Sequence, residues 1–147
     1  MPNLILCLNF ISTWYMVGLI WMVQVVHYPL MAKVSNENYV EYQQLHERMI
    51  TPVVGVPMLI EIVTAILLLN DLPKGVSAAW VWTAIGLVAV AWLATAFLSV
   101  PCHSKLNAGF DADIHRRLVD TNWIRTIAWT LRGGLVAWFV FGPRESY

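Results

Sequence analysis

Residues 49–69 read MITPVVGVPMLIEIVTAILLL, a predominantly apolar run with a single acidic residue, Glu61, beyond its middle. The run is long enough to cross a bilayer as a helix, which takes about 20 residues. An ionisable side chain at membrane depth is costly unless it faces a protein interior or a water-filled cavity. The stretch therefore predicts a membrane helix that packs against other helices, with Glu61 on the packed side.

Three further apolar stretches cover residues 4–26, 78–100 and 124–141. The whole chain is 59% hydrophobic and 12% charged, whereas soluble domains are about 45–50% apolar and about 25% charged. We therefore predict an all-α integral membrane protein that forms one transmembrane domain over residues 1–147. Its expected architecture is an up-and-down bundle of four transmembrane helices, with the lipid bilayer as its first partner.

All four histidines of the chain fall near the ends of apolar stretches on one side of this predicted bundle, called here the histidine-rich side. They are His27, His46, His103 and His115. Histidine is the commonest metal ligand and carries protons near neutral pH. One histidine from each helix, with Glu47 as the alternative to His46, would ring one end of the bundle and hold a transition metal or the iron of a haem. Any single histidine also suits an ordinary hydrogen-bonding role at a membrane interface.

The second and fourth helices are expected to extend beyond the bilayer on the histidine-rich side. Residues 36–50 continue the helical spacing of the second apolar stretch, and Asp111 is a plausible N-cap for the fourth helix. Pro29 and Pro101 are expected to end the first and third helices, since the residue before a proline disfavours helix.

Basic residues favour one orientation in the membrane. Two lie on the far side, Lys74 and Arg144, whereas the histidine-rich side carries Lys33, Arg48, Lys105, Arg116 and Arg117. By the positive-inside rule the histidine-rich side, with the first and third loops, is then cytoplasmic and both termini are outside. We expect the inner membrane of a bacterium. The formal net charge of zero gives no indication of a nucleic-acid partner.

Two oppositely charged residues are predicted to meet inside the bundle. Glu61 lies 12 residues into its stretch and Arg132 lies 8 residues into residues 124–141, which places them about 18 Å and about 12 Å deep at 1.5 Å per residue. Pairing is the simplest way to tolerate either charge there. The pair is either a structural tie between helices or part of a catalytic site, and both interpretations stay open.

The last helix carries a polar face that a lipid-exposed helix would not have. His115, Asn122 and Trp129 recur every seven residues, and Arg125 and Arg132 share an adjoining stripe. We predict that this face lines a pocket. In it Asn122 and Trp129 contact a cofactor, while the two arginines act with Glu61 in catalysis.

The layout of a short, all-helical chain with histidines and arginines at a membrane edge is similar to that of the membrane-bound protoporphyrinogen oxidases that bind haem. The likeness is one of layout, without a shared motif. It makes haem one of the expected cofactors. The stretches HYPLM (27–31), LHERMITP (45–52), VPCH (100–103) and TNWIRT (121–126) stand out in the chain and match no family of known function.

Two functions follow from these patterns. The first is a metal- or haem-dependent membrane oxidoreductase that acts on a hydrophobic substrate. The alternative is a non-catalytic subunit or binding protein for a quinone, pigment or lipid, with membrane-protein partners or as a homo-oligomer. A small transporter is less favoured, because transporter sites usually lie between repeats. A thiol–disulfide oxidoreductase is not expected, since Cys7 and Cys102 are placed at opposite ends.

Overall fold

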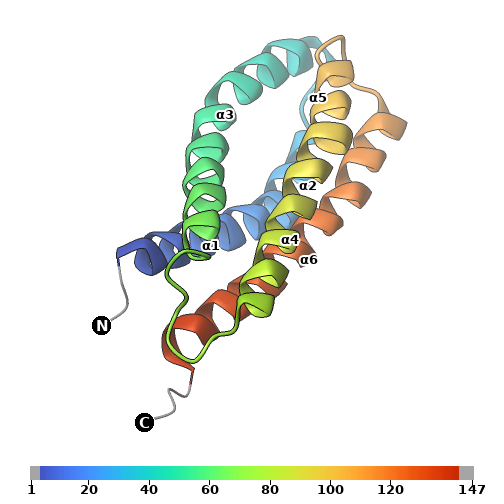
Figure 1. The fold of residues 1–147 in the computed structure, drawn as a ribbon. Coiled ribbons are helices and arrows are strands. Elements are labelled where there is room, and N and C mark those ends of the chain that lie inside the picture. Colours follow the sequence, from blue (N-terminus) through green and yellow to red (C-terminus); the bar gives the residue numbers. More distant parts are fainter. Residues whose placement is uncertain (1–3, 143–147) are drawn as a thin grey trace.

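The computed structural model describes residues 4–142, and these contain helices and connections but no strand (Figure 1). Residues 1–3 and 143–147, which include Arg144, lie outside the described part. The elements in chain order are α1 (Leu4–Met22), the π-helical turn η1 (Val23–His27), α2 (Tyr28–Met31), α3 (Asn36–Leu67), α4 (Ala78–Ala94), the π-helical turn η2 (Thr95–Ser99), α5 (Val100–Leu106) and α6 (Ala112–Phe141). The all-helical prediction is confirmed.

The elements form four long helical segments, because α1, η1 and α2 run on without a break, as do α4, η2 and α5 (Figure 1). α1 packs along both α3 and α6, and α6 also packs along α4. α3 and α4 touch each other much less. The packing is therefore closed on three sides and looser between α3 and the segment from α4 to α5.

Three of these segments are long and apolar enough to cross a membrane: Leu4–Met31, Asn36–Leu67 and Ala78–Leu106. α6 does not belong to this group, and its apolar part carries Arg125 and Arg132. The structure is thus compatible with a membrane protein.

The prediction that prolines end the first and third helices is wrong. The first continues through Pro29 to Met31, and the third continues through Pro101 to Leu106. A wider π turn precedes each proline: the Tyr28 N–H bonds to the Val23 carbonyl, and the Val100 N–H bonds to the Thr95 carbonyl. These turns carry the helix past residues that would otherwise clash with the preceding turn.

The predicted extension of the second and fourth helices is confirmed as continuous helix. α3 begins at Asn36, and α6 begins after Asp111, whose carboxylate accepts bonds from the Asp113 and Ile114 N–H groups at 2.9 Å each. α3 contains Pro52 and is visibly curved (Figure 1). Prolines inside a helix remove backbone donors and bend it.

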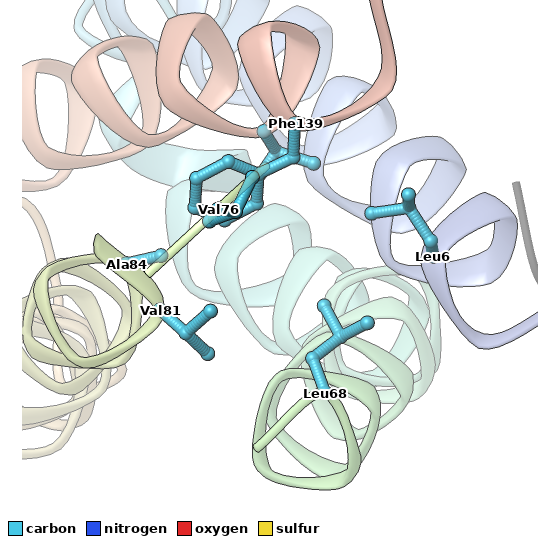
Figure 2. Packing of buried hydrophobic residues seen from close by; sticks show 7 residues of the cluster. Leu6, Leu68, Val76, Val81, Ala84 and Phe139 are labelled. Atoms are coloured by element: carbon cyan, nitrogen blue, oxygen red, sulfur yellow. The ribbon is translucent and has the colours of Figure 1, made fainter. Parts of the chain in front are cut away.

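Apolar packing closes the end of the bundle opposite the histidines. Side chains from all four long segments and from the link before α4 gather there (Figure 2). The buried members are Leu6, Leu68, Val76, Val81, Ala84, Val136 and Phe139. In lipid, helices associate largely through such van der Waals contact.

Gly133 permits a close approach between α1 and α6. A methyl group built on it would lie 3.0 Å from Val17 Cγ2, whereas one on its neighbour Gly134 would meet nothing within 4 Å. The small residue next to Arg132 thus lets α1 come close to α6 at this point.

We expect Gly133→Val to lower the free energy of unfolding by about 1–3 kcal/mol relative to Gly134→Val, because only the first side chain enters packed space. Both variants add the same β-branched side chain to the same helix, so propensity cancels. Unfolding in mixed micelles of mild detergent and SDS, followed by circular dichroism, gives the comparison. Equal losses for the two variants would contradict this packing.

Candidate functional site

Glu61 and Arg132 form the ion pair that their depths predict. Arg132 Nε donates to Glu61 Oε1 at 2.7 Å, and both side chains are fully buried. Thr13 Oγ1 donates to the same oxygen, and Trp129 Nε1 donates to Oε2, each at 2.9 Å. The carboxylate is therefore held by three donors from two other helices.

The other two guanidinium nitrogens of Arg132 also donate hydrogen bonds. Nη1 donates to the Ala84 carbonyl at 2.6 Å and Nη2 donates to Asn9 Oδ1 at 3.1 Å. The Asn9 amide turns back to α3, where it donates to the Glu61 carbonyl and to Thr64 Oγ1. α1, α3, α4 and α6 thus meet in one buried polar network, which fits a structural tie.

A cavity of about 360 Å³ lies nearer the histidine-rich side, away from this network. One wall is α3, the facing wall runs from α4 through η2 to α5, and α6 contributes Arg125. Most of the lining is apolar. The polar residues among it are Tyr28, His46, Glu47, Thr51, Trp92, Thr95, Ser99, His103 and Arg125. Glu61 and Arg132 do not line this cavity.

Arg125 is a buried cation on this cavity. Its side chain is enclosed, with the residue 6% exposed, and Nη1 donates to Ser99 Oγ at 2.9 Å. The guanidinium carbon lies 5.4 Å from the ring centre of Trp129, and Tyr28 lines the same cavity. Nε is buried without a hydrogen-bond partner. Within residues 4–142, no carboxylate lies within ion-pair distance of Arg125.

Three of the four histidines lie in a row on the cavity side. The ring centres of His27 and His46 are 4.4 Å apart and stacked, and His103 is 5.5 Å beyond His46. Gln43 Nε2 lies 3.0 Å from His103 Nδ1, and the Tyr28 hydroxyl lies 3.4 Å from His103 Nε2. His103 is thereby fixed between two polar neighbours.

His115 stands apart from this row. Its Nε2 lies 3.0 Å from the Tyr28 carbonyl, so that nitrogen is a donor and His115 ties α6 to the first helical segment. In the described part of the chain, no three His, Cys, Asp or Glu side chains are arranged to hold a metal ion. Of the four histidines predicted to ring one end of the bundle, three are neighbours and His115 lies apart from them.

The two residues predicted to contact a cofactor also lie off the cavity. Asn122 donates to Gln24 Oε1 at 2.7 Å and Trp129 donates to Glu61, both fully buried. The polar face predicted for α6 is confirmed as a buried face. Most residues of this face form hydrogen bonds to other helices, and only Arg125 of α6 lines the cavity.

Ser99 and Trp92 are site residues that the sequence patterns did not single out. Ser99 lies four residues before His103 on a helical segment, so that spacing was a usable signal for a shared face. Trp92 carries no such spacing signal within residues 78–100. Its Nε1 is buried without a partner and it lines the cavity.

Protein-family models, curated proteins and solved structures were compared with this chain, and no match was found.

Glu61→Gln and Arg132→Leu, made singly, are each expected to lower the free energy of unfolding by about 3–5 kcal/mol, because each leaves a buried charge unpaired. The double variant should lose clearly less than the sum of the two. Unfolding in SDS-containing micelles measures the cycle.

Arg116→Leu is the matched control, since Arg116 is exposed on the same helix and its pair with Asp113 at 3.8 Å is solvated. Its loss should stay within about 1 kcal/mol. Strict additivity of the Glu61 and Arg132 variants would refute the structural tie.

Proposed function

We propose that this chain is a membrane-embedded binding protein for a hydrophobic small molecule whose polar end is held at Arg125. The observation that carries the proposal is a buried guanidinium on a largely apolar cavity, with no carboxylate of residues 4–142 within ion-pair distance. Ligand pockets are commonly of this kind, with apolar walls and a few convergent polar groups that fix orientation. A volume of about 360 Å³ falls within their usual range.

The lining divides the ligand into two chemical parts. Arg125 and Trp92 can only donate hydrogen bonds, and each has a buried nitrogen without a partner. They suit an anionic or carbonyl end group. Val54, Met58 and Val100 are among the apolar residues that would cover the remainder. A quinone, a pigment or a lipid meets this general description.

The proposed setting is a bilayer crossed by all four long segments. α6 supports this despite its buried arginines, because its outward side chains include Ile127 and Leu131, which are 55% and 59% exposed. Exposed apolar residues occur on the other three segments as well. Such a surface fits lipid, other membrane proteins or a second copy of the chain. We propose a bacterial inner membrane with the cavity near the cytoplasmic side and both termini outside.

Arg125→Gln is expected to remove the bound molecule from protein purified in neutral detergent, because the end group loses its charged partner. Organic extraction followed by mass spectrometry compares the small hydrophobic molecules that accompany wild type and variant. The control is Arg116→Gln, which changes an exposed arginine on the same helix. An identical set of molecules in all three samples would argue against a site at Arg125.

A second candidate function is a metal- or haem-dependent oxidoreductase, and the row of His27, His46 and His103 favours it. His46 and His103 line the cavity and His27 stacks on His46, so imidazoles from three helical segments lie together where a cofactor would meet a hydrophobic substrate. Metal bound there would contribute redox or Lewis-acid chemistry. Arg125 would orient the substrate. Glu61 and Arg132 do not line the cavity and would act from their buried ion pair.

If this second candidate holds, purified protein contains stoichiometric metal or shows a Soret band, and His27→Ala with His103→Ala loses either signal. Elemental analysis and the absorption spectrum give the answer, with His115→Ala as the control because His115 lies outside the row. Folded wild-type protein that is colourless and free of metal would leave the binding function alone.

A further inference from the structure

We infer that the molecule bound at Arg125 is a singly charged anionic amphiphile: one carboxylate head on one long apolar chain. This inference rests on the proposed binding function and specifies its ligand class. It follows from the charges that the fold buries, the donors that it leaves open and the place where the packing is loosest.

The buried charges do not cancel. Glu61 and Arg132 neutralise each other at 2.7 Å, and each of the three guanidinium nitrogens of Arg132 donates a hydrogen bond. Arg125 is also buried, yet no carboxylate of the described residues is within ion-pair distance. One positive charge is left over in a low-dielectric interior, where an isolated charge is very costly. A ligand with one negative charge removes that cost, and a neutral one does not.

Among the described residues, Glu47 is the one acidic side chain that lines the cavity, and its carboxylate is bound elsewhere. Its Oε2 accepts a bond from Asn107 Nδ2 at 2.6 Å, which ties α3 to the end of α5. It is half-buried, and it lies beyond ion-pair distance from Arg125. Glu47 therefore leaves the Arg125 guanidinium without an ion pair. Its own negative charge on the wall repels a bound anion and weakens the binding.

The open hydrogen-bonding groups near the cation favour an acceptor with more than one lone pair. Arg125 Nε and Trp92 Nε1 are both buried donors without partners on the same cavity. A carboxylate accepts several bonds and matches the planar guanidinium in two parallel ones. A hydroxyl offers fewer acceptor sites and no charge. These properties separate a fatty acid from the corresponding alcohol.

The apolar tail of the amphiphile would lie between α3 and the segment from α4 to α5. These two walls pack against each other least of the neighbouring pairs. Ala96 and Val100 line the cavity and are also exposed, so the cavity reaches the lipid-facing surface. A single chain that leaves through this gap remains in contact with the bilayer. Gly55 lines the opposite wall, and a Cβ added to it would meet nothing within 4 Å.

The test compares four probes on wild-type protein in neutral detergent: palmitate, hexadecanol, methyl palmitate and acetate. Each competes with a fluorescent long-chain carboxylate, and displacement gives relative affinities. We expect palmitate to bind at least tenfold more tightly than hexadecanol or methyl palmitate, and acetate not to compete. Arg125→Gln should abolish the preference for palmitate, and Gly55→Leu should weaken every long-chain probe by filling the gap.

Glu47→Gln tests whether the charge of the bound head group determines its affinity. Removing its negative charge should tighten palmitate several-fold and leave hexadecanol unchanged, because only the first interacts with the charge of the wall. Arg116→Gln is the control variant and should behave as wild type. Circular dichroism and the unfolding midpoint establish that each variant is folded, and Arg125→Lys keeps the charge if the glutamine variant fails to fold.

The outcomes separate this inference from the function on which it rests. Equal affinity for palmitate, hexadecanol and methyl palmitate would overturn the anionic head and keep a hydrophobic ligand. Competition by acetate as strong as by palmitate would overturn the long chain. No binding of the fluorescent probe or of any competitor to folded wild-type protein would overturn the proposed binding function itself.

Discussion

The burial of Glu61 and Arg132 is the constraint on which the rest of the structure depends. Two charges taken out of water or lipid headgroups are tolerated only when each polar atom finds a partner. Here the partners come from α1, α3, α4 and α6, and they include a backbone carbonyl, that of Ala84. A sliding or rotated helix would break at least one of these bonds. The network therefore fixes the register of four segments that apolar contact alone would hold less specifically.

The same constraint explains why Arg125 differs from Arg132, although the two lie seven residues apart on one stripe of α6. Glu61 is the carboxylate at the right depth for one of them, and its two oxygens are already bound by three donors. Arg125 is left with Ser99 and the face of Trp129. Identical side chains with the same spacing thus have different chemistry: one is neutralised by the fold, and the other is available to a ligand.

Sequence periodicity and depth predicted much of this arrangement, and local backbone chemistry limited it. The buried face of α6, the Glu61–Arg132 pair and the Asp111 cap follow from spacing along single helices. Continuation through Pro29 and Pro101 did not, because a π turn has no clear sequence signature and the general effect of proline is to end a helix. The separation of His115 from the other histidines depends on helix rotation, which residue counts at one bundle end do not specify.

The backbone distortions next to the prolines contribute to the shape of the cavity. Both π turns contribute to its wall, η1 through Val23 and η2 through Thr95 and Ser99, while the curved part of α3 forms the opposite wall. A π turn shifts the residues that follow it around the helix axis, so Tyr28 and His103 point where a regular helix would not place them. The buried polar network and the apolar cluster at the opposite end keep the four segments together, whereas α3 packs less closely against α4. A rigid end and a distorted end thus explain how so short a chain encloses a pocket beside a buried cation.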